Sequence, residues 1–183
     1  MLGRLSGVLI ALVALVAAGV EARAQAVSSI DIVEYGLYVA DVESTEVLPN
    51  GLASNTLSSL CHVATTRTVP ARMGIHFGFR FRTNGPNNGI VGLRKIIVFP
   101  VDMLPPGLSP LRTAEFPIRK LIGSVSYTGY GFDHAWEMQL GTWTTQIWEG
   151  NRKLAEVNFI VVDAGDPSVP PFGDSRCFQI SQL

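Results

Sequence analysis

Residues 141–162, GTWTTQIWEGNRKLAEVNFIVV, contain two apolar runs separated by a short polar turn. Apolar and polar side chains alternate within each run, and this period of two is typical of a strand that is buried on one face. The turn at 149–152 contains a glycine, so the two strands are predicted to form a β-hairpin. We expect four side chains of this hairpin to share the protein core: Trp143, Ile147, Val157 and Phe159.

The same alternation recurs at 74–83, GIHFGFRFRT, where every second residue is large and apolar. This pattern predicts a core strand whose buried face carries Ile75, Phe77, Phe79 and Phe81. Shorter apolar or β-branched runs predict further strands at 30–39, 62–70, 90–100 and within 118–132. Pro70 ends the second of these runs because proline has no N–H to offer a sheet.

Two segments between these strands are predicted to be loops. Residues 41–60 are polar, with room for at most one weak edge strand, and residues 101–117 carry four prolines. Because no amphipathic helix is convincing, the whole pattern predicts an all-β fold, a single immunoglobulin-like antiparallel β-sandwich of about seven strands. This domain is expected to span 25–163, and the proline- and glycine-rich tail 164–183 is expected to be irregular.

The N-terminus has the pattern of a secretory signal peptide. Arg4 precedes an uncharged apolar stretch at 5–20, and Ala22 and Ala24 stand at the spacing that a signal peptidase accepts. We expect residues 1–24 to be removed by cleavage after Ala24, or alternatively after Ala26. A retained membrane anchor is the competing interpretation, but the apolar stretch is short for a span, which needs about 20 residues. The sequence therefore predicts a periplasmic or secreted protein with no stable membrane span.

The two cysteines, Cys61 and Cys177, lie in the predicted mature chain. An even count in an exported protein predicts a disulfide bond between them, and two free thiols are the alternative. No Cys-x-x-Cys motif is present, which argues against redox catalysis. The formal net charge of the chain is −1, so there is no basic field to attract nucleic acid.

Three stretches together resemble a known bacterial family. VEYGLY at 33–38, VPARMGIHFGFRF at 69–81 and the hairpin at 141–162 are similar to a family described as domain of unknown function 3859. The resemblance covers roughly 30–163. It implies export and a β-sandwich, and it implies no activity, so it supplies no catalytic residue.

A group of aromatic residues around the last hairpin is the main candidate for a binding site. Exposed aromatic side chains anchor interfaces because they bury a large area at a low entropy cost. We expect Trp148, Tyr130 and Trp136 to contribute to binding, and Arg80 and Arg82 to lie on an open strand face. The alternatives are a second aromatic core layer that includes Tyr127 and Phe132, stacking on a sugar and, for the arginines, a solvated surface.

Catalytic and metal sites have weaker support in the sequence. Asp133, His134 and Glu137 form the one tight acid–base cluster, for which a solvated turn is the simpler interpretation. His62, His76 and Cys61 lack the short recurrent spacings of a metal site, and DAGD at 163–166 lacks the further ligands of a calcium loop. We therefore expect no catalytic residue, no metal and no cofactor.

These observations predict a non-catalytic binding or accessory module of the bacterial envelope, whose partner is another envelope protein. A small-ligand or glycan-binding protein that uses the aromatic cluster is one alternative. A hydrolytic enzyme built on the acidic and histidine cluster at 133–137 is the least favoured alternative.

Overall fold

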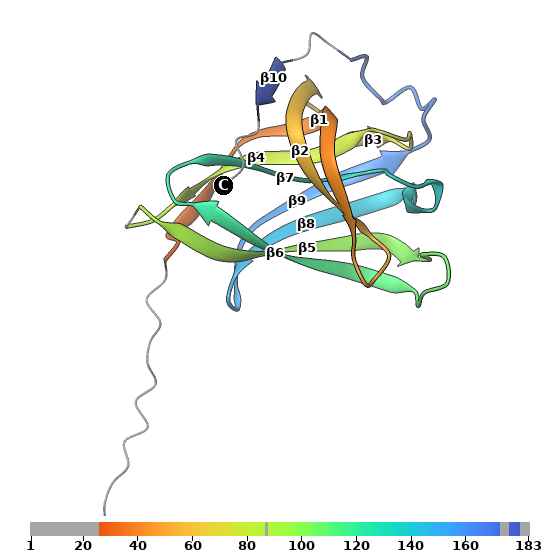
Figure 1. The fold of residues 1–183 in the computed structure, drawn as a ribbon. Coiled ribbons are helices and arrows are strands. Elements are labelled where there is room, and N and C mark those ends of the chain that lie inside the picture. The colour runs from red at the N-terminus through yellow and green to blue at the C-terminus, as the bar shows by residue number, and fades with distance from the viewer. Residues whose placement is uncertain (1–25, 87, 173–175, 180–183) are drawn as a thin grey trace, which may run out of the picture.

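A computed structural model describes residues 26–86, 88–172 and 176–179, and its fold is two five-stranded β-sheets packed face to face (Figure 1). The first sheet has the strand order β10-β2-β1-β4-β7, with bounds, in that order, Arg176–Gln179, Ala53–Ala64, Ser29–Val47, His76–Asn84 and Val125–Gly131. The second sheet has the order β3-β9-β8-β5-β6, with bounds Thr68–Pro70, Arg152–Val162, Gly141–Glu149, Ile90–Met103 and Leu111–Leu121. A short 3₁₀ helix, η1 (Ala135–Glu137), precedes β8.

Neighbouring strands are antiparallel in both sheets, except that β3 runs parallel to β9. The predicted all-β sandwich is therefore confirmed, with ten strands in the described part of the chain rather than about seven. One added strand comes from the predicted strand 62–70, which is divided in two. Its first part ends β2 at Ala64, and its second part is β3, which begins at Thr68 in the other sheet.

The centre of the core is Trp143 on β8, which is fully buried between the sheets. Four rings surround it at centroid distances of 5.0 to 5.7 Å: Phe77, Phe99, Tyr130 and Phe132. On the neighbouring strand Phe159 lies directly opposite Trp143 in the β8–β9 register, as the hairpin pattern predicts. Burying each such ring stabilises the fold by about 1.5–3 kcal/mol. The other predicted core residues of the run 74–83, of β8 and of β9 are confirmed as buried: Ile75, Phe79, Phe81, Ile147 and Val157.

The prediction that 41–60 is a loop is wrong. β1 and β2 continue through this segment as a paired ladder that ends with Val47 opposite Ala53. We call residues 41–59 the arm. Figure 1 shows the arm crossing the second sheet toward the turn between β5 and β6. Much of the arm is exposed, Val47 by 71%, so its residues have no buried face to impose a period of two.

The tip of the arm packs on the β5–β6 turn. Leu52 is fully buried there, and Gly51 has φ +80°, a conformation that favours glycine. A Cβ atom on Gly51 would lie 2.7 Å from Cδ1 of Leu108 and 2.9 Å from Cβ of Pro105. This contact holds the arm across the open side of the sandwich.

The prediction of a long loop at 101–117 is also wrong for most of its length. β5 extends to Met103, and β6 begins at Leu111, so the connection spans only 104–110. Pro117 lies within β6, opposite Arg94. It is tolerated because β6 is the last strand of its sheet, where a residue without an N–H breaks no ladder on the open side.

The C-terminal tail contains a short strand where irregular structure is expected. β10 pairs with β2, and Cys177 lies opposite Cys61 in the register. The sulfur atoms are 2.08 Å apart, at disulfide-bonding distance, in agreement with the predicted pairing. The predicted signal peptide, residues 1–24, lies outside the described residues. Within the part of the chain that the structure describes, no helix has the length and apolar character needed to cross a membrane.

Candidate functional site

A cleft of about 1000 Å³ lies between the arm and the edges of the two sheets. β7 and β6 end their sheets on the same side of the sandwich, and the arm covers the opening between them. Its apolar lining includes Leu57 from the arm, Phe116 and Ile118 from β6, and Val125 from β7. The volume is at the upper end of the range, roughly 300–1,000 Å³, that is usual for ligand sites.

Lys95 lines this cleft from a core-facing position on β5, where an apolar residue is expected. The core-facing residues of β5 are Val91, Leu93, Ile97 and Phe99, all buried, and Lys95 occupies the remaining position of that set. Its side chain is half-buried and reaches from the second sheet to the edge of the first. Nζ donates a hydrogen bond to the carbonyl oxygen of Gly129 on β7 at 3.1 Å, and it lies 4.1 Å from the ring centroid of Phe116.

Lys120 is a second lysine on a core-facing position. On β6 it follows Ala114, Phe116 and Ile118 on the inward side, and it is half-buried at the wall of the cleft. Burial lowers the pKa of both lysines, and the pKa of Lys95 falls to about 8. The charge of Lys120 is a second, smaller cause of the lowered pKa of Lys95, and both side chains line the cleft.

β7 is the last strand of its sheet, so its edge on the side of the cleft pairs with no other strand in the described part of the chain. The side chain of Tyr127 extends from β7 across β4 toward Tyr38 on β1, with ring centroids 5.0 Å apart, and its hydroxyl lies 3.4 Å from the carbonyl oxygen of Phe77 on β4. A Cβ atom on Gly129 would collide with the Tyr127 hydroxyl and with that carbonyl. Glycine is therefore required at 129, and its carbonyl oxygen is the atom of β7 that Lys95 contacts.

The predicted aromatic binding cluster is not brought together. Tyr130 and Phe132 are core residues that pack on Trp143, as the alternative of an aromatic core layer describes. Trp136 is half-buried within η1, and its ring stacks with that of His134 at a centroid distance of 5.8 Å. Trp148 is half-buried on the outer face of the second sheet, where its Nε1 donates to Oε1 of Gln146 at 2.9 Å.

The two arginines predicted to bind a partner lie in different surroundings. Arg80 is half-buried, lines the cleft, and has Nη1 3.7 Å from Oε1 of Glu34. Arg82 is exposed two residues further along β4, outside the lining of the cleft. Of the five predicted binding residues, Arg80 and Tyr130 contribute to the cleft.

The carboxylates of the predicted acid–base cluster, Asp133 and Glu137, form internal hydrogen bonds near η1. Glu137 is only 1% exposed, and its carboxylate accepts hydrogen bonds of 2.7 Å from the Tyr130 hydroxyl and from the backbone N–H groups of Asp133 and His134. Burial raises the pKa of Glu137. Asp133 accepts two hydrogen bonds from Nδ2 of Asn55, which tie the arm to the body. The interpretation as a solvated turn is therefore wrong for Glu137, because its carboxylate is committed to three internal donors.

The histidines are placed on the first sheet. His62 is buried, with Nε2 3.2 Å from the carbonyl oxygen of Tyr35, and burial lowers the pKa of His76. Across the described ranges, no three His, Cys, Asp or Glu residues are grouped so that they could hold a metal ion.

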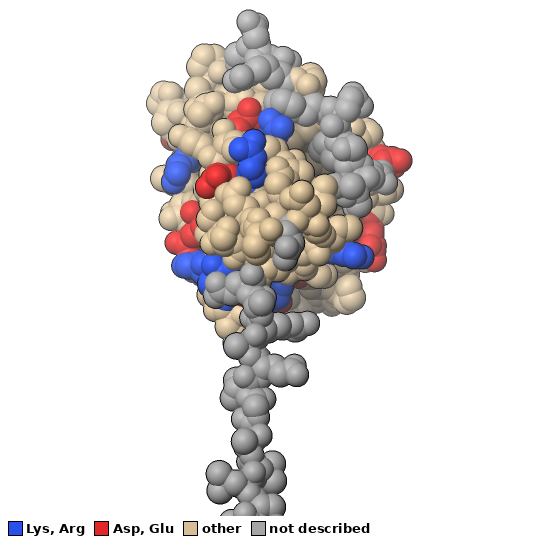
Figure 2. Space-filling model, turned by 90° about the vertical axis from the view of Figure 1, so that its left-hand side faces the viewer, with Lys and Arg blue, Asp and Glu red and all other residues tan. Residues whose placement is uncertain are grey.

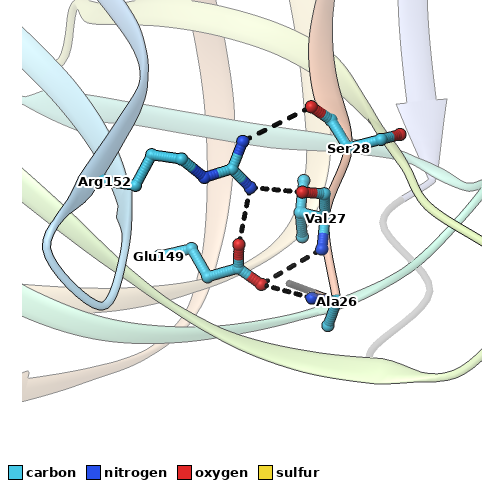
Figure 3. Close-up of polar contacts among 5 residues, drawn as sticks. All are labelled: Ala26, Val27, Ser28, Glu149 and Arg152. Carbon is cyan, nitrogen blue, oxygen red and sulfur yellow. Dashed lines mark hydrogen bonds and ion pairs between the residues drawn. The ribbon is translucent and has the colours of Figure 1, made fainter. Parts of the chain in front are cut away.

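Glu149 and Arg152 form polar contacts with the backbone just before β1, which the sequence did not predict (Figure 3). Glu149 accepts hydrogen bonds from the backbone N–H groups of Ala26 at 3.0 Å and Val27 at 3.1 Å. Arg152 donates to the carbonyl oxygens of Val27 and Ser28, and it forms an ion pair of 2.7 Å with Glu149. Both side chains flank the turn of the β8–β9 hairpin, and opposite charges at the two ends of that turn were the available signal.

Two packed sheets, a tryptophan-centred core and a cross-linked edge define an immunoglobulin-like β-sandwich. The sequence profile of the family "Domain of unknown function (DUF3859)" matches residues 26–161, and the chain belongs to that family. The fold is also similar to the crystal structure of an immunoglobulin-like protein from Pseudomonas aeruginosa. That match has a TM-score of 0.53 and 24% sequence identity, and it covers 75% of this chain and 100% of the other. A search of curated protein sequences finds no match.

Proposed function

We propose that this protein is a non-catalytic binding module of the bacterial envelope that takes an extended segment of another exported protein into the cleft. The observation that carries the proposal is the position of the cleft, because it is walled by the open edge of β7. An unpaired strand edge is a template for a further strand, which adds by backbone hydrogen bonds and places alternate side chains in pockets.

The backbone geometry of β7 supports this mode of binding. Phe132, just beyond β7, exchanges hydrogen bonds with the segment that leads into β4, whereas the Gly129 carbonyl accepts its bond from Lys95. In an antiparallel ladder alternate residues direct both backbone groups to the same side. Tyr127 and Gly131 therefore share the outward direction of Gly129, toward the cleft.

Export is supported by two observations. The cysteine pair at disulfide-bonding distance is typical of proteins in oxidising compartments, and the residues before the domain have the pattern of a signal peptide. The glycan alternative has no supporting observation, because Trp148, Tyr130 and Trp136 do not form one platform.

Site-specific photo-cross-linking in the native envelope tests the proposal. A cross-linking residue is placed at Ser126 on β7 or at Leu57 on the arm, both in the lining of the cleft. The matched control is Thr142, which is exposed on β8. We expect both cleft positions to capture the same polypeptide through the same segment, and Thr142 to capture none of it. Equal capture from Thr142, or no capture from either cleft position, would contradict the proposal.

A further inference from the structure

Lys95 and Lys120 each bring a positive charge to the lining of the cleft, as do Arg80 and Arg119. Four ion pairs are found among the described residues, and neither Lys95 nor Lys120 belongs to any of them. An ammonium group has three N–H donors, and the one hydrogen bond of Lys95 goes to Gly129. Lysine on a core-facing position normally extends to solvent or pairs with a carboxylate, because burying an unpaired charge is costly.

Three carboxylates line the cleft, Glu46, Glu115 and Asp133, and none of them forms an ion pair with Lys95 or Lys120 in the described part of the chain. Glu46 is exposed on the arm. Glu115 is exposed and pairs with Arg94 at 3.0 Å on the opposite face of β6. Asp133 is held by Asn55, and Glu137 by its three internal donors. Two lysines on the wall of one cleft, neither of them in an ion pair among the described residues, are the complement of an anion that comes from outside.

The surroundings favour a singly charged, partly apolar ligand. Phe116, Ile118 and Val125 line the cleft beside the two lysines. A polyanion would instead be attracted by a broad basic surface, whereas this cleft is also lined by Glu46, Glu115 and Asp133. On the face of the molecule that Figure 2 shows, acidic and basic side chains are likewise interspersed. A carboxylate carried on a chain with apolar neighbours fits both the charges and the lining.

We infer that Lys95 and Lys120 form a carboxylate site, which takes an acidic side chain of an extended peptide laid along the edge of β7. This inference rests on the proposed function of the cleft and specifies what the bound segment must carry. Lys95 links the carboxylate site to the strand edge that would bind the peptide. Its Nζ donates a hydrogen bond to the carbonyl oxygen of Gly129 on β7, and its side chain lines the cleft. The peptide backbone would pair with the outward groups of β7, and one Asp or Glu would lie between the lysines.

Isothermal titration of the mature, disulfide-bonded protein tests the site. The probes are an acetylated, amidated peptide Thr-Val-Thr-Glu-Thr-Val-Thr, its twin with Gln in place of Glu, sodium acetate and inorganic phosphate. The variants are Lys95→Met and Lys120→Met. The control is Lys153→Met, which removes a lysine that pairs with Glu156 at 2.6 Å outside the cleft.

We expect the Glu peptide to bind about tenfold tighter than its Gln twin at pH 7, the order of magnitude of one charge-assisted contact. Lys95→Met and Lys120→Met should each abolish that preference and still bind the Gln peptide, and Lys153→Met should keep it. Equal affinity for the two peptides overturns the carboxylate site but leaves strand binding in the cleft intact.

The remaining outcomes separate this inference from the proposed function. Saturable acetate binding that both cleft variants lose, without binding of either peptide, keeps the lysine site and overturns the peptide as its source. Phosphate that binds tighter than acetate at the same lysines overturns the choice of a carboxylate. If no probe binds although cross-linking at Ser126 succeeds, the inference fails and the proposed function stands.

Discussion

At the scale of single residues, Lys95 shows how a binding site can weaken the fold that carries it. Its core-facing position places an ammonium group where its charged form is disfavoured, and the pKa falls from 10.5 to about 8. The unfolded chain keeps the ordinary pKa, so between these two values the unfolded state binds more protons. Stability should therefore rise with pH in that window, and the full destabilisation should be present below pH 8.

Lys95→Met tests this linkage. The variant should be more stable than the wild type at pH 7 by up to about 3 kcal/mol, the free energy that corresponds to this fall of the pKa. The advantage should shrink as the pH rises from 8 to 10, because the wild-type lysine loses its charge. Urea denaturation at several pH values measures both curves. Parallel curves for the two proteins over the whole range would show that burial of Lys95 does not perturb its pKa.

The two tryptophans of the last hairpin have opposite expected roles in stability. Trp143→Ala should destabilise the protein by about 3–5 kcal/mol, because it removes the fully buried ring at the centre of the core. Trp148→Ala should cost much less, because this ring is half-buried on the outer face of the sheet. Chemical denaturation of both variants provides the comparison, and a near-neutral Trp143→Ala would contradict the assignment of the core face of β8.

At the scale of elements, the arm depends on the packing of its tip. Gly51→Ala should destabilise the protein for two reasons: the left-handed backbone, which costs about 1–2 kcal/mol, and the collision of the new Cβ with Leu108 and Pro105. Gly107→Ala is the matched control, since Gly107 has φ +75° and open space around its Cβ position. The difference between the two free energies of unfolding measures the tip contact, and equal losses would mean that the tip does not hold the arm.

The elements also show which sequence patterns are informative. β8 and β9 were predictable because each has one buried face, which imposes alternation on neighbouring residues. β4 was predictable because its large apolar residues all lie on one face, although its first four residues are buried on both faces. The arm was not, because its residues are held by ladder hydrogen bonds and by contacts of the tip rather than by a buried stripe. β6 was obscured by Pro117, which an edge strand accepts and a central strand would not.

At the scale of the whole molecule, the bond between Cys61 and Cys177 closes a loop of 116 residues that includes most of the fold. Replacing both cysteines by serine should destabilise the protein, by up to about 4–5 kcal/mol if the chain-entropy model holds. Intact mass before and after reduction reports the bond itself. An unchanged mass on reduction would contradict the bridge, whatever the stability of the double variant.

Local sequence pattern was enough to predict the β-sandwich, its tryptophan- and phenylalanine-rich core and the cysteine pair. These features depend on alternation between neighbours and on residue counts, which a chain displays before it folds. The candidate site was decided only by tertiary structure. Lys95 and Lys120 line one wall because β5 pairs with β6, and they face a cleft because the arm crosses the open side of the sandwich. The physical reason is that a cleft is a relation between the edges of two sheets and the arm, and no single segment of the chain encodes it.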